Sequence, residues 1–305
     1  MSEEIAIVAQ GLFKSYGRVR ALQGIDLDVR RGEVFGYLGP NGAGKTTTIR
    51  CLLDLIRPDG GTVRVLGIDP QADPVAVRAR VGYLPGELQV NPNMTVEGVL
   101  RYFNALRGNK TEWGFVRQLA ERLDLDLVPM IKNLSHGNKQ KVGVVQALMH
   151  QPELLLLDEP TLGLDPLMQR EVLRLISEAK AGGAAVFFSS HIMSEVETVA
   201  ERVAIIRKGV VVEVAEPSSL IDRALRRANV RFKQPVDVGP LANVPGVTVL
   251  SQDDGTSVLL QVAGEMDGLI KALGAFPVSD FETERPSLEE IFLTYYEDDR
   301  KEAQA

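Results

Sequence analysis

Short apolar segments separated by glycine-rich turns dominate the first two thirds of the chain. Residues 24–29 alternate apolar and polar side chains, a pattern typical of a strand with one buried face. Residues 154–157 are all leucine, which predicts a strand buried on both faces of a parallel sheet. Other segments with strand patterns are 5–8, 33–38 and 184–189, together with a hairpin of 203–206 and 210–214 joined across Lys208 and Gly209.

Helical patterns alternate with these strands. Residues 90–150 are mostly helical by pattern, and individual helices are expected at 46–56, 96–106, 113–123 and 167–181. Because strands and helices alternate around buried apolar segments, we predict an α/β architecture for this part of the chain.

The pattern changes near residue 222, where Arg223, Arg226 and Arg227 mark a polar connection. Beyond it lie segments with strand patterns at 230–232, 247–250 and 257–262 and with helical patterns at 266–273 and 288–296. The sequence therefore predicts two domains, a large one over residues 1–222 and a small α+β accessory domain over residues 223–305.

Composition limits the classes of function. The chain has 305 residues, 45% of them hydrophobic, with a net charge of −7. Because no basic run accompanies that charge, we expect no nucleic-acid partner. Cys51 is the one cysteine, which excludes an intramolecular disulfide and is consistent with a reducing compartment. No apolar run approaches the ~18–20 residues of a spanning helix, so any membrane crossing is expected in a different protein.

A glycine-rich phosphate-binding motif follows the strand predicted at 33–38. Its form is G-x-x-x-x-G-K-[ST], and it opens a predicted helix, the context that the motif requires. Backbone N–H groups and the helix N-terminus favour bound phosphate; Lys45 is placed to reach the β- and γ-phosphates, and the Thr46 hydroxyl to bind Mg²⁺. The motif comprises Gly39, Pro40, Asn41, Gly42, Ala43, Gly44, Lys45 and Thr46.

Two carboxylates end the leucine strand. Asp158 lies at the carboxyl edge of the predicted sheet, where open α/β sheets bind ligands, and is expected to hold Mg²⁺. Glu159 is expected to polarise the water that attacks the γ-phosphate. A solvated acidic turn would explain the pair alone, but its combination with the phosphate motif favours a nucleotide site.

With these motifs the chain resembles the ATP-binding cassette (ABC) ATPases over residues 16–215. Leu134 to Asn138 resembles the family's signature segment, 156–161 its Walker B segment and 163–165 its D-loop. His191 corresponds to the switch histidine, and Tyr16 lies where the family stacks an aromatic ring on adenine.

The resemblance implies a P-loop NTPase fold, with a mixed sheet, a helical subdomain and an N-terminal antiparallel β-subdomain. It implies ATP and Mg²⁺ as cofactors, Glu159 and His191 as catalytic residues, and Thr46 and Asp158 as metal ligands. In the family, the signature helix of one subunit faces the γ-phosphate held by the other. The residues expected to contact nucleotide, beyond the phosphate motif, are Tyr16, Thr47, Ser135, Gly137, Asn138 and Asp165.

The same resemblance implies partners. We expect a homodimer working with a transmembrane permease subunit and held at the cytoplasmic face of the cell membrane. The groove for that partner is expected near residues 82–106. Similarity of the signature variant and of the ending at 288–293 to drug, antibiotic and lipid exporters favours export. A ribosome-associated or cofactor-assembly ATPase, an importer and a non-hydrolysing regulator stay open as alternatives.

The chain departs from the family pattern at two places. Gly86 occupies the position of a glutamine that usually contributes to Mg²⁺ or water, and Glu87 beside it is a possible substitute. His136 replaces a signature glycine, and Asn138 replaces the last signature glutamine. His136 is either a pH-sensitive contact to the γ-phosphate or an exposed neutral imidazole.

Overall fold

The computed structural model describes residues 4–223 and 226–284. The chain divides into two compact units, Met1–Ala215 and Glu216–Ala305. The domain boundary expected between residues 222 and 223 stays a prediction. Each unit has its own sheet and its own buried core.

A six-stranded sheet forms the centre of the first unit. Its order is β5-β6-β7-β3-β8-β9, with every pair parallel except β8 and β9, which form the predicted antiparallel hairpin. All residues of β3, β6 and β7 are buried, as a strand covered on both faces requires. The strands are β3 (Val34–Leu38), β5 (Val81–Leu84), β6 (Leu154–Asp158), β7 (Ala185–Ser190), β8 (Arg202–Arg207) and β9 (Val210–Ala215).

A three-stranded antiparallel sheet lies on one side of the central sheet. It consists of β1 (Ile5–Tyr16), β2 (Val19–Arg30) and β4 (Gly60–Val65) in the order β2-β1-β4. Helix α1 (Lys45–Leu52) lies between the two sheets and shares one apolar core with both. The alternation predicted at 24–29 is confirmed, because its apolar side chains are buried in that core and its polar ones are exposed.

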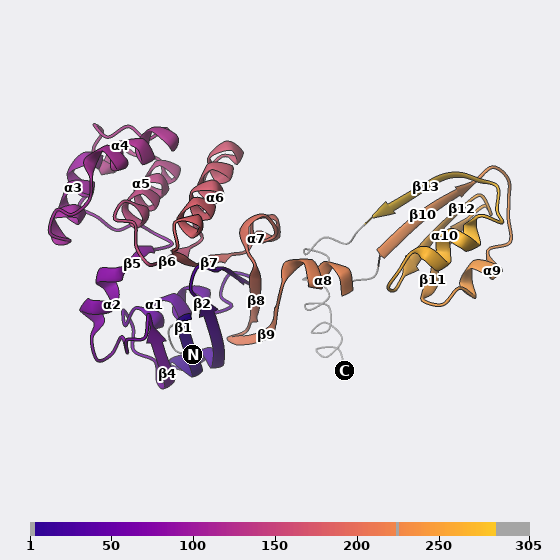
Figure 1. The fold of residues 1–305 in the computed structure, drawn as a ribbon, viewed down its shortest axis with the longest axis horizontal. Coiled ribbons are helices and arrows are strands. Elements are labelled where there is room, and N and C mark those ends of the chain that lie inside the picture. Colours follow the sequence, from indigo (N-terminus) through magenta and orange to yellow (C-terminus); the bar gives the residue numbers. More distant parts are fainter. Residues whose placement is uncertain (1–3, 224–225, 285–305) are drawn as a thin grey trace. The chain divides into compact units, whose positions relative to one another are not determined.

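Helices cover the opposite face of the central sheet. Figure 1 shows α3, α4 and α5 on the far side of that sheet from β1, β2 and β4. The helical pattern at 90–150 is therefore confirmed as three α-helices and a short 3₁₀ turn. The elements are α2 (Pro74–Arg80), α3 (Val96–Leu106), α4 (Trp113–Arg122), the 3₁₀ turn Ile131–Asn133, α5 (His136–Leu148), α6 (Pro166–Ala181) and α7 (Met193–Val199).

The helix predicted at 46–56 is too long. It ends at Leu52, because Asp54 adopts a left-handed backbone with φ 48° and breaks the helical hydrogen-bond pattern. Strand β4 and helices α2 and α7 were not predicted from the sequence.

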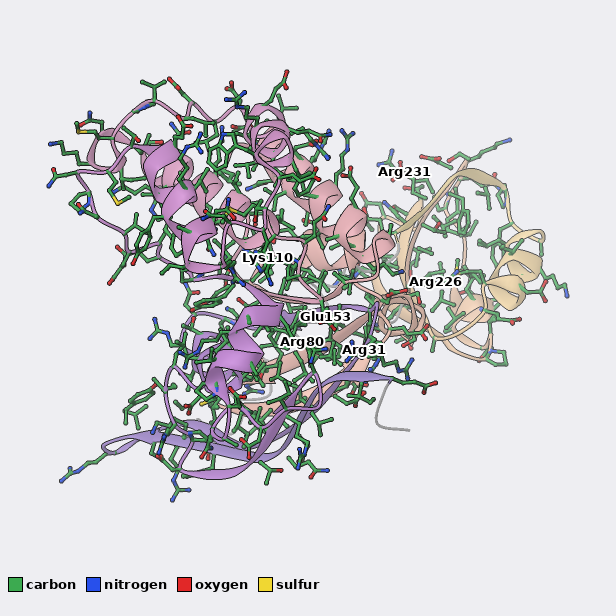
Figure 2. All side chains as sticks on the ribbon, turned by 60° about the vertical axis from the view of Figure 1, so that its left-hand side comes forward. Arg31, Arg80, Lys110, Glu153, Arg226 and Arg231 are labelled. Atoms are coloured by element: carbon green, nitrogen blue, oxygen red, sulfur yellow. The ribbon has the colours of Figure 1, made fainter. Side chains whose placement is uncertain are left out.

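Ion pairs fix the edges of the first unit. Glu153, just before β6, receives two hydrogen bonds of 2.6 Å from Arg80 and one of 3.2 Å from Arg31 (Figure 2). Arg122 of α4 bonds both Glu171 and Glu178 of α6, each at 2.6 Å. The first group joins the amino edge of the sheet to its neighbours, and the second joins the helical subdomain to α6.

The second unit is a four-stranded antiparallel sheet with short helices. The strand order is β11-β12-β10-β13, and Val258, Leu260 and Val262 of the strand predicted at 257–262 are buried in the core of this unit. The helix predicted at 288–296 lies outside the described residues. The elements are α8 (Pro217–Arg223), β10 (Arg226–Phe232), α9 (Gly239–Ala242), β11 (Val247–Asp253), β12 (Ser257–Val262), α10 (Asp267–Leu273) and β13 (Val278–Glu284).

Candidate nucleotide site

The phosphate loop connects the carboxyl end of β3 to the first residue of α1. Gly44, which caps α1, has φ 115°, and a Cβ there would lie 2.7 Å from the carbonyl oxygen of Ala21. A Cβ on Gly39 would lie 2.5 Å from the carbonyl oxygen of Ile206. Both positions therefore accept glycine alone, and the loop is pressed against β2 and the end of β8.

Lys45 carries the positive charge of the loop. Its side chain is only 5% exposed, and its Nζ donates hydrogen bonds to the carbonyl oxygens of Gly39 and Pro40. The same Nζ lies 3.0 Å from Oε1 of Glu159. The buried ammonium is thus partnered by two carbonyl dipoles and one carboxylate, which a buried charge requires.

Asp158 is the last residue of β6, and only one of its two carboxylate oxygens forms a hydrogen bond among the described residues. Oδ1 accepts a hydrogen bond of 2.7 Å from the Ser189 hydroxyl. Oδ2 is buried and has no hydrogen-bond partner among the described residues. A buried, unpartnered carboxylate oxygen is costly, and a hard cation such as Mg²⁺ would satisfy it. The donor set therefore fits the predicted metal.

Gly86, which follows β5, lies against that open oxygen. A Cβ on Gly86 would sit 3.2 Å from Oδ2 of Asp158, closer than ordinary van der Waals contact. The position at which the family usually has a glutamine is therefore beside the expected metal ligand, while Glu87 next to it is exposed.

Glu159 adopts an unusual backbone that turns its side chain toward the phosphate loop. Its φ is 51°, a left-handed value that costs energy for a residue other than glycine. Its N–H donates to Ser189, to the carbonyl oxygen at 3.2 Å and to Oγ at 3.1 Å. Its carbonyl accepts 2.9 Å from Nε2 of the buried Gln140. These bonds hold the strained conformation from both sides.

His191 meets Glu159 at the end of β7. Its Nδ1 lies 2.6 Å from Oε2 of Glu159, and its ring is 38% exposed. The structure therefore joins Lys45, Glu159 and His191 into one chain of contacts beside Asp158. A carboxylate bridging a cation and an imidazole can hold a water molecule and accept its proton.

The signature segment lies at the start of α5. Ser135 caps this helix and accepts 3.2 Å from the N–H of Asn138. A Cβ on Gly137 would lie 2.7 Å from the carbonyl oxygen of Gly163, so the helix start packs on the D-loop of its own chain. Asp165 caps α6 by accepting from the N–H groups of Leu167 and Met168, at 3.0 and 3.1 Å.

The other predicted nucleotide contacts are Tyr16, Thr46 and Thr47. Tyr16 ends β1 with 48% of its surface exposed, and Nζ of Lys14 lies 5.8 Å from its ring centre. Thr46 and Thr47 occupy the first turn of α1 and are partly buried. An exposed ring at a strand end remains free to stack on a base.

Ser189 and Gln140 take part in the site without having been predicted in it. Ser189 bonds both Asp158 and Glu159, and Gln140 holds the Glu159 carbonyl. No local pattern marks either residue, because both roles arise from strand pairing and helix packing between distant segments.

A groove opens between the helical subdomain and the core of the first unit. Its volume is about 1700 Å³, and it is lined by residues of β5, α2, α3, α4 and the loops beside them, among them Tyr83, Glu87, Phe103, Leu106 and Lys110. Within residues 4–223 and 226–284, no helix is both long and apolar enough to cross a membrane.

Two family models match the chain. The model of ABC transporters matches residues 22–162, and that of the C-terminal domain of DrrA1-3-like ATP-binding proteins matches residues 221–296. The daunorubicin resistance ATP-binding protein DrrA3 of Streptomyces coeruleorubidus is 34% identical, covering 99% of each chain. The chain belongs to the family of ABC transporter ATP-binding proteins.

Other ABC relatives agree with this assignment. The daunorubicin/doxorubicin resistance ATP-binding protein DrrA of Streptomyces peucetius is 32% identical over 94% of this chain and 91% of its own. The bacitracin transport ATP-binding protein BcrA of Enterococcus faecalis is 34% identical over 73% of each. Family membership identifies this ABC subunit as an ATP-binding protein that hydrolyses ATP.

Solved ABC structures have the same fold. An ATP-binding subunit of an ABC transporter is 30% identical, with a TM-score of 0.64 over 70% of this chain and 91% of that one. A dimeric bacterial ABC transporter cassette is 20% identical, with a TM-score of 0.64 over 69% of this chain and 98% of that one. The predicted P-loop NTPase fold of this ABC subunit is confirmed.

Proposed function

We propose that two copies of this chain bind Mg²⁺-ATP between them, and that hydrolysis drives export through a separate transmembrane subunit. The observation that carries the catalytic part is the contact chain from Lys45 through Glu159 to His191. Each of these side chains comes from a different loop at the carboxyl edge of the central sheet.

We assign the chemical roles from this geometry. Glu159 accepts the proton of the attacking water, and His191 orients that water and bonds the γ-phosphate. Lys45 binds the β- and γ-phosphates, together with the backbone N–H groups of residues 39–46. Asp158 and the Thr46 hydroxyl would hold Mg²⁺, which when bound neutralises phosphate charge.

The second half of each site is proposed to come from the partner copy. Ser135 and Gly137 lie at the start of the 13-residue helix α5, whose N-terminal N–H groups favour an anion. Within its own chain this helix start packs on the D-loop, so we assign Ser135, Gly137, Asn138 and the nearby Asp165 to the nucleotide of the other subunit.

The groove of about 1700 Å³ is proposed as the seat of the transmembrane subunit. It lies near residues 82–106, where the contact is expected from the sequence, and Glu87 lines it. A partner seated there would contact the residue directly after Gly86, which lies beside Asp158. Its lining has four basic residues, Arg50, Arg78, Arg107 and Lys110, against two acidic ones, Glu87 and Glu112, and this balance favours an acidic partner segment. The chain would then be peripheral to the cytoplasmic face of the membrane.

The transported molecule is proposed to be a drug, antibiotic, lipid or similar amphipathic compound. The names of relatives support this class, since they include daunorubicin resistance, bacitracin transport and Nod factor export proteins. Residues 223–305 are proposed as an accessory domain of such exporters, and residues 1–222 as the ATPase domain.

The test measures Mg²⁺-dependent ATP hydrolysis against protein concentration. We expect a specific rate that rises with concentration, because each site needs two chains. Lys45→Ala should abolish ATP binding, whereas Lys271→Ala, an exposed lysine of the second unit, should not change it. A specific rate independent of concentration would contradict the two-chain site.

The partner assignment has its own test. Lys110→Glu reverses a charge of the groove and should reduce co-purification with the transmembrane subunit while leaving ATP binding intact. Lys271→Glu makes the same change outside the first unit. Equal capture of the transmembrane subunit by both variants would contradict the proposed docking groove.

A further inference from the structure

Glu195 is a buried carboxylate that the proposed chemistry does not use. It lies in α7, four residues after His191, and is only 5% exposed. Its Oε1 accepts a hydrogen bond from the Thr161 hydroxyl, and its Oε2 accepts one of 2.7 Å from the Ser190 hydroxyl. Both oxygens thus receive a donor, as a buried carboxylate requires.

The two hydroxyls belong to the two loops that carry the proposed catalytic side chains. Thr161 follows Glu159 by two residues, in the loop after β6. Ser190 is the last residue of β7 and directly precedes His191. Glu195 therefore joins, through one rigid carboxylate, the segments on which Glu159 and His191 stand.

Ser190 extends this connection to the phosphate loop. Its hydroxyl also accepts 2.9 Å from the N–H of Ile192, and its carbonyl accepts 3.2 Å from the N–H of Gly39. Ser190 thus forms hydrogen bonds with the residue after His191 and with Gly39, the first glycine of the phosphate loop.

We propose that Glu195 is a positioning residue for ATP hydrolysis, which holds the Glu159 and His191 loops at the separation that their 2.6 Å contact requires. The inference rests on the proposed roles of those two residues. Glu195 does not touch the nucleotide itself; it acts through Thr161 and Ser190.

The electrostatic setting makes a purely space-filling role for this carboxylate unfavourable. Burial raises the pKa of Glu195, and the nearby Glu159 carboxylate raises it further, while the two hydroxyl donors and His191 lower it. An apolar side chain would avoid the cost of burial. The two acceptor oxygens of Glu195 offset that cost by bonding hydroxyls of two different segments.

Glu195→Gln tests the proposal, because it keeps the shape but turns one acceptor oxygen into an NH₂ donor facing a hydroxyl. We expect kcat for ATP hydrolysis to fall by roughly 10- to 100-fold, the scale of a misplaced reacting group. The KM for ATP should stay within about twofold, because Lys45 and the phosphate loop keep their contacts. The matched control is Glu197→Gln, an exposed glutamate of the same helix.

A double-mutant cycle with His191→Ala separates positioning from general damage to the fold. If Glu195 acts through His191 and Glu159, Glu195→Gln should cost less than about threefold once His191 is absent. Fully additive losses, or an unchanged kcat in Glu195→Gln, would overturn the proposal. Equal losses in Glu195→Gln and Glu197→Gln would also overturn it.

Two further variants keep the outcome decisive. If the thermal unfolding curve shows that Glu195→Gln does not fold, Ser190→Ala replaces it, because it removes one of the two hydrogen bonds to Glu195. Ser190→Ala should lower kcat without changing KM. A normal kcat in Ser190→Ala would overturn the inference. Glu159→Gln is measured alongside. A normal rate of ATP hydrolysis in Glu159→Gln would contradict the proposed function. If Glu159→Gln loses hydrolysis while Glu195→Gln hydrolyses ATP at the normal rate, only this inference is contradicted.

Discussion

Oε1 of Glu159 lies 3.0 Å from Nζ of Lys45, so the proposed general base is paired with the phosphate-binding cation. The two side chains are 14% and 5% exposed, and their attraction is little screened by solvent. In the proposed site, the γ-phosphate of ATP needs the same ammonium. We therefore expect nucleotide and Glu159 to compete for Lys45, and ATP binding to release the carboxylate to meet the attacking water.

Glu159→Gln should separate binding from hydrolysis. We expect hydrolysis to fall by ~10²–10⁴-fold, because the amide cannot accept the water proton. ATP affinity should rise several-fold, about 1 kcal/mol, because a neutral amide competes less well for the Lys45 ammonium. Single-turnover hydrolysis and equilibrium nucleotide binding measure the two effects separately.

The control for this pair of measurements is Glu97→Gln. Glu97 is a partly buried glutamate of α3 that pairs with Arg101, and its substitution should change neither quantity. Normal hydrolysis by Glu159→Gln would contradict the catalytic assignment. Lost hydrolysis with unchanged affinity would keep that assignment and contradict the competition for Lys45.

Gly86→Ala should weaken the use of Mg²⁺. The new Cβ would sit 3.2 Å from Oδ2 of Asp158, and Ser189 restrains the other carboxylate oxygen. Crowding of this kind costs roughly 1–3 kcal/mol, so we expect the Mg²⁺ concentration for half-maximal hydrolysis to rise about fivefold or more. The readout is an Mg²⁺ titration at saturating ATP.

Gly114→Ala is the matched control for Gly86→Ala. Gly114 lies in α4, and a Cβ there would meet no atom within 4 Å. It should leave the Mg²⁺ titration unchanged. If Gly86→Ala left it unchanged as well, Gly86 would not be beside the metal position.

The local motifs were predictable from the sequence because their chemistry depends on neighbours in the chain. Gly39 and Gly44 mark a turn that a Cβ would block, and the leucines before Asp158 mark a strand buried on both faces. Such features correctly predicted the strand that ends at Asp158 and the turn before the helix that begins at Lys45, while the roles of both residues stay predictions.

The connections between loops were not predictable. Ser189 meets Asp158 because β6 and β7 are neighbours in register, and Gln140 reaches the Glu159 carbonyl because α5 packs on the sheet. Glu195 looks like an ordinary polar residue of a short helix, and only packing buries it. The positive φ of Glu159 likewise follows from its tertiary contacts and not from its own preference.

Gly163→Ala should impair the signature helix and the D-loop together. Gly163 has φ 75°, which costs a residue with a Cβ roughly 1–2 kcal/mol, and its Cβ would lie 2.7 Å from Cδ2 of His136. We expect ATP-dependent dimerisation, measured by light scattering in a Glu159→Gln background, to weaken by about tenfold. Adding His136→Gly removes the contact with the His136 ring and should restore part of the lost dimerisation.

Gly264→Ala controls for backbone strain alone. Gly264 has φ 84° and a Cβ there would meet nothing within 4 Å. Dimerisation equal to that of the parent protein is expected for this variant. Failure of His136→Gly to restore any dimerisation in Gly163→Ala would show that the backbone, and not the ring, sets the effect.

His150 should make the protein less stable at mildly acidic pH. Burial first, and the Arg107 guanidinium second, lower its pKa to about 4 from 6.5. Because the unfolded chain binds a proton near pH 6.5 and the folded chain does not, stability falls as pH drops from about 6.5 toward 4. After allowance for partial exposure, we expect this residue to cost about 1–2 kcal/mol at pH 5 relative to pH 7.5.

The structure gives the physical reason for that low pKa and a way to test it. Nε2 of His150 lies 3.3 Å from the carbonyl oxygen of Val81, and its Nδ1 is buried without a hydrogen-bond partner among the described residues, so a second proton would have no acceptor. His150→Gln should therefore lose less stability than the parent between pH 7.5 and 5, in urea unfolding at both values. His136→Gln changes an exposed histidine and should keep the parent's pH dependence. The same acid sensitivity in His150→Gln and in the parent would mean that other groups cause it.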